Sequence, residues 1–244
     1  MSENDRITQV EKALIGLRGL VMSGEFEPGS RLPEIAISER LEISRTPLRQ
    51  AMDRLVAEGL LERIETGGCR VATFDFADVV DAIELRGVIE GTAARLAAER
   101  GAAPQHFAEA RRILGAIDDI MSNVQAIDLD RYARLNSEFH ALLAVMAGSS
   151  IVRREIDRIN RLPMAGPSAF LSVQEGMPDF IASLAGAQEQ HYAILDAIES
   201  REGARAEALL REHARLARRN LKFLKDADPR VATRVPGMSL LTAQ

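Results

Sequence analysis

The sequence SRTPLRQAMDRLVAEGLLERIETGGCRV, residues 44–71, decides the fold of the first part of this chain. Ser44 is a residue type favoured at helix N-caps, and Pro47 suits the first turn of a helix, where a missing N–H costs nothing. Apolar residues then recur at helical spacing: Leu48, Met52 and Leu55. Gly59 can adopt the left-handed conformation that commonly ends a helix. The stretch therefore predicts a helix that begins near Ser44 and stops before Gly59.

The flanking residues complete a small module. LLERI and CRVATF flank ETGG, which predicts two short strands joined by a tight glycine turn. Upstream, Thr8 and Glu11 form a capping-box pattern ahead of a helical stripe, and Ile37 and Leu41 suit a short second helix. Hydrophobic spacing alone would allow any small three-helix module. The hairpin directly after the third helix favours a winged helix-turn-helix instead.

The rest of the chain is predicted to be helical. Helices are expected over 78–100, 104–124, 128–147, 149–160, 179–200 and 202–225. The stretch from Arg161 to Asp179 holds three prolines and two glycines, which predicts a long loop. We therefore expect a mostly α protein in three parts: a winged helix-turn-helix domain over 1–75, an all-α helical bundle for effector binding and dimerisation over 76–228, and an irregular tail over 229–244.

The composition is that of a globular protein without membrane spans. Of 244 residues, 46% are hydrophobic and 27% charged, and no stretch approaches the roughly 18 uninterrupted apolar residues that a span needs. The polar N-terminus does not resemble a secretory signal. The single cysteine, Cys69, excludes an intrachain disulfide and a cysteine-based zinc site. We therefore expect a cytoplasmic protein with no membrane partner.

The net charge of −5 excludes a basic surface as the source of any nucleic-acid binding. Even residues 1–75 hold 10 basic and 13 acidic side chains. DNA binding would have to come from a few placed arginines. Arg45 and Arg49 lie four residues apart, on the helix face opposite the apolar stripe. A guanidinium there can donate two hydrogen bonds to guanine or clamp a phosphate.

Other residues near these arginines suit contacts with the DNA backbone. Ser44 and Thr46 can donate to phosphate, aided by the free N–H groups and positive dipole of the helix start. Gly67 and Gly68, at the tip of the predicted hairpin, allow a close approach of the wing to DNA. The alternative is that the two arginines are ordinary solvated charges. The helix-turn-helix context favours DNA recognition.

The sequence resembles a known family over residues 8–225. RLPEIAISERLEISRTPLRQAMDRLVAEGLLER followed by GGCRV resembles the N-terminal domain of GntR-family transcriptional regulators. LRGVIEGTAARLAAERG resembles the opening helix of the FCD effector domain, which is found in the FadR-like subfamily. NSEFHALLAVMAG, EQHYAILDAI and LLREHARLA resemble its histidine-bearing segments. The resemblance implies that DNA is contacted by Ser44, Arg45, Thr46, Pro47 and Arg49, with Gly67 or Gly68 in the wing.

Three residues depart from the pattern of this family. Glu42 stands where the family usually has glycine, so it is strained if that backbone needs a positive φ. Ile35 stands where some members carry a base-reading arginine, which predicts that base specificity rests on the third helix alone. Ser149 replaces a common asparagine after Ala-Gly.

The histidines of the second part are candidate metal ligands. Imidazole nitrogens with an amide or carboxylate oxygen suit Zn²⁺, Ni²⁺ or Mn²⁺ when they converge, but spacing alone cannot show convergence. From the residues alone, each histidine could equally serve packing. The resemblance implies a divalent transition-metal site made by Asn136, His140, His191 and His213. His106 matches nothing in the family and is expected to be exposed.

Arg86 is the candidate effector-binding residue. Arg86 and Glu90 are four residues apart on one predicted helix, so they could simply form a surface salt bridge. Alternatively, Arg86 faces a cavity and clamps a carboxylate with two hydrogen bonds. The resemblance favours the second interpretation, because family members often sense small carboxylic acids.

The leading hypothesis is a ligand-responsive transcriptional regulator, not an enzyme, that binds a palindromic operator as a homodimer. One module reads only a few base pairs, and a two-fold dimer supplies the remaining affinity. An alternative is a metal-dependent helical enzyme that uses His140, His191 and His213, but nothing in the sequence resembles a catalytic motif. A third hypothesis is a metal sensor that uses the same histidines.

Overall fold

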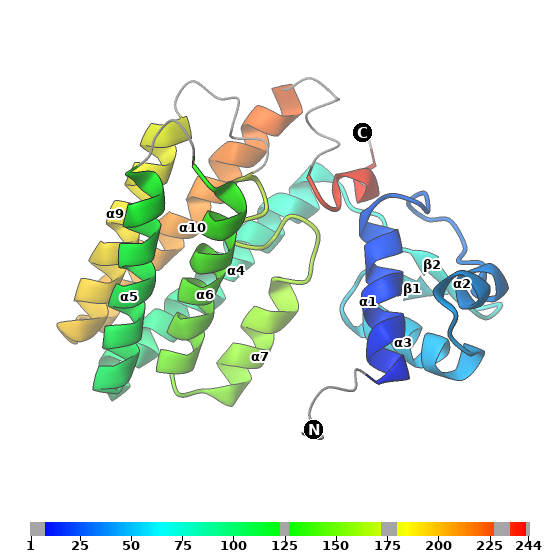
Figure 1. Cartoon of the computed structure of the whole chain (residues 1–244), viewed down its shortest axis with the longest axis horizontal. Coiled ribbons are helices and arrows are strands. Elements are labelled where there is room, and N and C mark those ends of the chain that lie inside the picture. The colour runs from blue at the N-terminus through cyan, green and yellow to red at the C-terminus, as the bar shows by residue number, and fades with distance from the viewer. Residues whose placement is uncertain (1–7, 123–126, 172–179, 227–234, 243–244) are drawn as a thin grey trace. The chain divides into compact units, whose positions relative to one another are not determined.

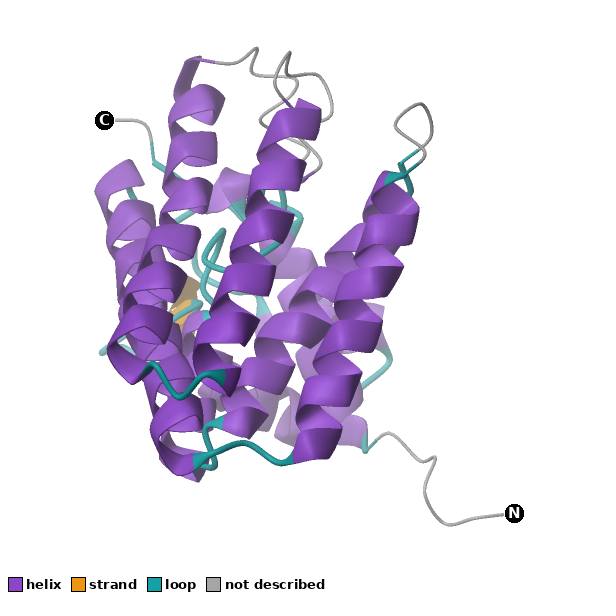
Figure 2. Cartoon of the chain, turned by 90° about the vertical axis from the view of Figure 1, so that its left-hand side faces the viewer, coloured by secondary structure: helices purple, strands orange, loops and turns teal. Residues whose placement is uncertain are grey.

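The computed structural model describes residues 8–122, 127–171, 180–226 and 235–242. Helices dominate the described chain, and its one sheet is a two-stranded hairpin (Figure 2). The predicted mostly α fold class is confirmed. Within these residues, no helix combines the length and apolar character that crossing a membrane requires.

The chain forms two compact units. The first consists of residues 1–79, 162–164 and 236–244, and the second of residues 80–161 and 165–235. In the first unit the element order is the predicted one (Figure 1). Its elements are α1 (Gln9–Met22), α2 (Glu34–Leu41), α3 (Arg45–Ala57), β1 (Leu61–Arg63) and β2 (Cys69–Val71).

Local sequence signals explain the boundaries of these elements. The Thr8 hydroxyl accepts a hydrogen bond from the Glu11 N–H while the Glu11 carboxylate accepts one from the Thr8 N–H, so the capping box is present. Gly59 ends α3 with a φ of +81°. The strands pair antiparallel with Leu61 opposite Val71, and the predicted apolar stripe of α3 is buried. The first unit is therefore a winged helix-turn-helix.

The end of the chain belongs to this unit, which the expectation of an irregular tail did not anticipate. Residues 238–240 form a short 3₁₀ helix, η1 (Met238–Leu240). The fully buried Leu240 packs in the core cluster of the winged helix-turn-helix. Phe74 N–H donates to the Leu240 carbonyl, and Thr242 N–H donates to the Phe74 carbonyl. Such a short segment carries no periodic pattern, so its docking is visible only in three dimensions.

The second unit is a helical bundle. Its helices are α4 (Phe76–Arg100, which begins in the first unit), α5 (Pro104–Met121), α6 (Leu129–Met146), α7 (Ser150–Ile159), α9 (Phe180–Glu199) and α10 (Gly203–Asp226). α5 packs against α6 and α9, and α9 packs against α10 (Figure 1). The described part of the predicted loop, 161–170, consists of turns, and 172–179 lie outside the described residues.

We predict that Leu240→Ala destabilises the winged helix-turn-helix by about 2–4 kcal/mol, because truncation leaves a cavity in its core. Chemical denaturation measures the change. Ser239→Ala, at an exposed neighbouring position, is the control and should change stability by less than about 0.5 kcal/mol. Equal stability of the two variants would show that the docked tail contributes nothing to this unit.

Candidate DNA-binding and ligand-binding sites

The N-terminal end of α3 is open to solvent. Ser44 occupies the N-cap position, but its hydroxyl accepts no hydrogen bond from the first turn of the helix. Arg45, Thr46 and Arg49 are exposed, and Pro47 lies in the first turn as predicted. The unused hydroxyl and the free N–H groups of this helix end are therefore available to an anionic partner.

A groove brings the start of α3 together with the start of α2 and the tip of the wing. Its lining residues are Arg31, Leu32, Pro33, Glu34, Ile35, Arg45, Arg49, Thr66, Gly67 and Gly68. Arg31 Nη2 donates to the Gly67 carbonyl at 2.8 Å, which ties the wing to the loop before α2. Arg49 Nε donates to Glu34 Oε2 at 2.8 Å. The structure thus places the sequence-predicted residues Arg45, Arg49, Gly67 and Gly68 around one groove.

The turn between α2 and α3 holds the backbone of Glu42 in a conformation that is costly for any residue other than glycine. Glu42 has φ +54° and ψ +43°, which is the left-handed region. For a residue with a Cβ this conformation costs about 1–2 kcal/mol. The backbone at Glu42 therefore has the positive φ at which we expected this residue to be strained. Glu42 is strained where glycine would not be.

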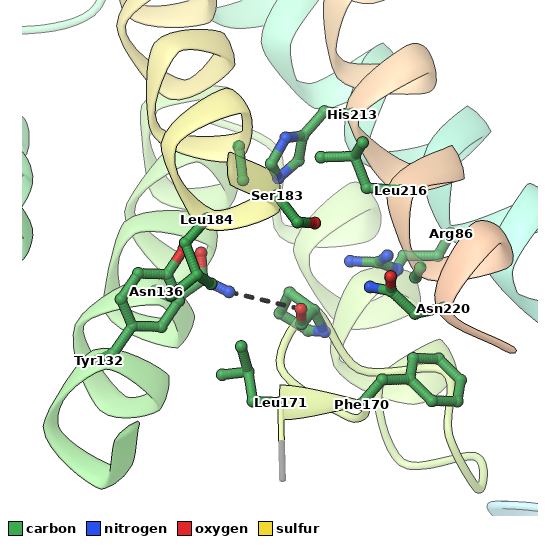
Figure 3. Close-up of a pocket in the computed structure, with 13 residues that line it drawn as sticks. Arg86, Tyr132, Asn136, Phe170, Leu171, Ser183, Leu184, His213, Leu216 and Asn220 are labelled. Atoms are coloured by element: carbon green, nitrogen blue, oxygen red, sulfur yellow. Dashed lines mark hydrogen bonds between the residues drawn. The ribbon is translucent and has the colours of Figure 1, made fainter. Parts of the chain in front are cut away.

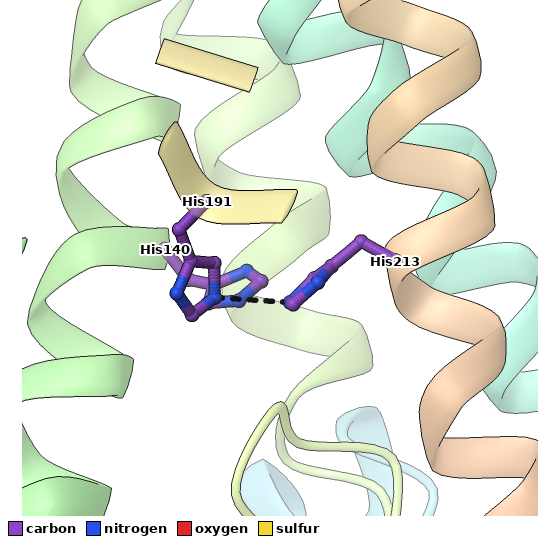
Figure 4. Close-up of side chains that lie close together, drawn as sticks. All are labelled: His140, His191 and His213. Atoms are coloured by element: carbon purple, nitrogen blue, oxygen red, sulfur yellow. Dashed lines mark hydrogen bonds between the residues drawn. The ribbon is translucent and has the colours of Figure 1, made fainter. Parts of the chain in front are cut away.

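Three histidines from three helices converge inside the second unit. His140 comes from α6, His191 from α9 and His213 from α10, and all three are buried (Figure 4). One nitrogen of each ring lies within 4.8 Å of the other two. His191 Nε2 and His213 Nε2 are 3.1 Å apart. His106 lies outside this cluster and is half-buried, not exposed as expected.

The contacts of the three Nδ1 atoms indicate where the ring protons of the histidines lie. His140 Nδ1 lies 3.2 Å from Glu90 Oε1, and a carboxylate oxygen can only accept. His191 Nδ1 lies 3.1 Å from Gln188 Oε1. The amide group of Gln188 is oriented because its Nε2 donates to the Leu114 carbonyl and to Asp118 Oδ1. His213 Nδ1 likewise lies 3.0 Å from Gln190 Oε1.

The Glu90 carboxylate requires a proton on His140 Nδ1, and the oriented Gln188 amide oxygen requires one on His191 Nδ1. The Nε2 atom of a neutral His191 then presents a lone pair to the middle of the cluster. His213 Nε2 lies within hydrogen-bond distance of it, and the tautomer of His213 decides whether it donates. His140 Nε2 is buried and has no hydrogen-bond partner among the described residues. Buried ring nitrogens that converge in this way are donor atoms suited to a metal ion.

Protonation of His191 and His213 is disfavoured. Burial lowers the pKa of His191 well below its ordinary value, and the nearby His140 charge lowers it further. Burial also lowers the pKa of His213, with smaller contributions from His191, His140 and Arg86. Both imidazoles are therefore neutral at pH 7, which is the form that binds a metal.

Asn136 lies one helical turn before His140 and is buried. Its Nδ2 donates to Ser168 Oγ at 3.0 Å and more weakly to the Pro167 carbonyl at 3.4 Å, the bond drawn in Figure 3. These contacts orient the amide and leave Oδ1 buried without a partner in the described chain. An unpaired amide oxygen is a ligand suited to a divalent ion.

The cluster adjoins a pocket that contains Arg86. Arg86, Asn136 and His213 line it together with Tyr132, Phe170 and Asn220 (Figure 3). The cavity volume is about 50 Å³, which is room for a few water-sized groups. Burial raises the pKa of Tyr132 to about 12, so this phenol stays protonated. The pocket therefore suits a small polar ligand.

Arg86 is almost fully buried with unused donors. Its Nε and Nη1 have no hydrogen-bond partner in the described structure. Glu90 Oε2 is 3.6 Å from Nη1, an ion pair too long to be a hydrogen bond. Burial raises the pKa of Glu90, but the charges of His140 and Arg86 outweigh that effect and leave it lowered. Glu90 is thus ionised, with Arg86 on one side and His140 on the other.

Sequence reasoning missed the groups that orient the histidines. Gln188 lies three residues before its partner His191 on α9, so this contact has a local signal in the sequence. Gln190 contacts His213, 23 residues away on α10, and that contact has no local signal. Glu90 was noted only as a partner of Arg86. Its contact with His140 spans 50 residues of sequence and has no local signal.

A winged helix-turn-helix and a separate helical unit with a ligand pocket together define a ligand-responsive class of transcriptional regulator. The comparisons with known proteins agree with this. Residues 9–71 match the GntR family of bacterial regulatory proteins, and residues 81–216 match the FCD domain. The chain belongs to the GntR family of transcriptional regulators and carries an FCD effector domain.

Relatives and solved structures support the same assignment. The chain is 30% identical to the Nta operon transcriptional regulator of Aminobacter aminovorans, over 58% of this chain and 65% of that protein. It is 25% identical to the transcriptional repressor GlaR of Escherichia coli, over 81% and 88% of the two chains. The fold resembles that of E. coli McbR/YncC, with a TM-score of 0.63, 20% identity and coverage of 91% and 99%. The relatives from A. aminovorans and the GlaR protein of E. coli are regulators of transcription, not enzymes.

Proposed function

We propose that this protein binds a palindromic DNA operator as a homodimer and that a small carboxylate bound in the second unit changes its affinity for that operator. The observation that carries the DNA-binding part is the groove where the exposed start of α3 meets the wing. An α-helix fits the major groove, and Arg45 and Arg49 supply the donors that guanine or phosphate accepts.

Replacing either arginine should weaken operator binding. Arg45→Ala and Arg49→Ala are each expected to cost about 1–3 kcal/mol in binding free energy, measured by fluorescence anisotropy at fixed salt. Arg112→Ala is a matched control, because its 59% exposure is close to the 60% of Arg49 and it pairs with Glu109 on α5. Operator affinity equal to wild type in both test variants would contradict the assignment of α3.

A dimer follows from the small footprint of one winged helix-turn-helix, because two half-sites are needed for specific affinity. The second unit offers exposed apolar side chains that a partner could cover. Leu85 and Val88 lie three residues apart on α4, with 50% and 36% exposure, and Ile151 on α7 is 64% exposed.

Analytical ultracentrifugation should therefore give twice the 26.7 kDa chain mass at micromolar concentration. A fragment of residues 76–244, which keeps α4 whole, should also dimerise if the apolar side chains of the second unit form the interface. A monodisperse monomer of the full chain would contradict the dimer and with it the palindromic operator.

We propose a divalent transition metal at the histidine cluster, held by His140, His191 and His213 with Asn136. Zn²⁺ with bonds of about 2.0–2.1 Å requires tetrahedral ligand atoms about 3.3 Å apart. The 3.1 Å separation of His191 and His213 is close to that spacing. With a metal bound, Glu90, Gln188 and Gln190 would accept hydrogen bonds from the three Nδ1 atoms, which leaves the Nε2 atoms free as ligands. A bound ion would act as a Lewis acid that holds one oxygen of an acidic ligand.

We propose a small carboxylate as the effector because Arg86 offers unpaired N–H donors that a carboxylate can accept. Its buried N–H donors lack partners, which costs about 1–3 kcal/mol or more for a charged group. A carboxylate would satisfy these donors with two parallel hydrogen bonds. The cavity of about 50 Å³ limits the ligand to a short chain in this conformation.

Removing one histidine should abolish metal binding. Wild-type protein purified without a histidine tag and incubated with Zn²⁺, Ni²⁺ or Mn²⁺ should retain about one equivalent by elemental mass spectrometry. Its melting temperature should also rise, because the ion ties three helices together. His191→Ala should lose the metal and keep operator binding. His106→Ala, outside the cluster, is the control and should keep both.

Less than a tenth of an equivalent in the wild type would mean that the histidines serve packing or direct ligand binding. A response of operator affinity to metal alone, with no carboxylate effect, would instead favour the metal-sensor alternative.

A further inference from the structure

The DNA-facing groove contains one large aliphatic side chain that the fold does not use. Ile35 lies at the start of α2 and is 64% exposed. Ile37, two residues on, is 2% exposed and packs in the core of the first unit. Because α2 already anchors itself through Ile37, the exposed Ile35 contributes nothing visible to stability.

The neighbours of Ile35 make an apolar group at this place unusual. Arg45 and Arg49 line the same groove. Glu34 accepts a hydrogen bond from Arg49 Nε, and Arg31 is bound to the wing at Gly67. The buried Leu32 is not available to a partner. Pro33, at the N-cap of α2, is exposed in the groove as well, but its ring is held by the backbone. Ile35 is therefore the exposed open-chain aliphatic group within a groove otherwise suited to polar and anionic contacts.

Only one group in the major groove of DNA is apolar, the C5-methyl group of thymine. Apolar side chains distinguish thymine by contact with this methyl group. We propose that Ile35 contacts a thymine methyl group in each operator half-site and so specifies a base that the arginines of α3 do not read. This inference rests on the proposed DNA binding. It revises the expectation that base specificity comes from the third helix alone.

The expected effect is small and measurable. Burying one methyl group corresponds to about a fourfold change in affinity. A symmetric operator with the change in both half-sites should show the square of that factor, about 16-fold. Contacts with phosphate would give no such dependence on a single methyl group.

The experiment uses the full-length protein. It first selects its operator from random duplex DNA, and each thymine of the selected site is then replaced by deoxyuridine, which lacks only the 5-methyl group. One position per half-site should show about fourfold weaker binding by wild-type protein. Ile35→Ala should bind the thymine operator about fourfold less tightly per half-site and should bind the uracil operator no more weakly than the thymine operator.

Ile15→Ala is the matched control, because Ile15 on α1 is 65% exposed and does not line the groove. This variant should keep the wild-type sensitivity to uracil. Thermal denaturation of both variants verifies that they are folded.

Two results would overturn the inference while leaving DNA binding intact. One is a wild-type protein that is insensitive to uracil at every position. The other is an Ile35→Ala variant with undiminished sensitivity, which would mean that another side chain reads the methyl group and that Ile35 serves a different partner. Failure to select any DNA sequence would instead overturn the proposed DNA binding, and this inference with it.

Discussion

Three imidazole rings that converge in the buried middle of the second unit are the constraint on which its chemistry depends. Glu90 and Gln188 place a proton on the outward Nδ1 of His140 and of His191, and Gln190 contacts Nδ1 of His213. Burial disfavours protonation of His191 and His213. The helices α6, α9 and α10 therefore meet at three buried ring nitrogens, the donor set that we propose holds a metal ion.

A second incomplete feature lies beside the first. Arg86 is buried with unused donors, and Glu90 stands between its guanidinium group and His140. The Glu90 carboxylate compensates part of the Arg86 charge but accepts no hydrogen bond from Nε or Nη1 of Arg86. An anionic ligand in the adjoining pocket would complete the hydrogen bonding of Arg86. A metal and a carboxylate would thus satisfy neighbouring parts of one buried polar network, which is a physical reason for them to bind cooperatively.

Much of the fold was predictable from local patterns. The stripe of α3 and the paired glycines of the wing were sufficient for the winged helix-turn-helix, because each signal acts within a few residues. The docking of Leu240 was not predictable, since one leucine near a chain end has no periodicity to interpret. In the site, the resemblance supplied the histidines and Asn136, and Arg86 was picked out by its spacing from Glu90. The convergence of the rings and the role of Glu90 depend on tertiary structure, because their partners lie tens of residues apart.

The central claim is that the three histidines are arranged to hold a cation through their inward nitrogens. Anomalous diffraction from crystals of the wild-type protein grown with Zn²⁺ tests it most directly. The account predicts one strong anomalous peak about 2.0–2.1 Å from Nε2 of His140, His191 and His213. A cluster without an anomalous peak, with ring nitrogens bridged by water or with a ring rotated so that Nδ1 faces inward, would contradict it.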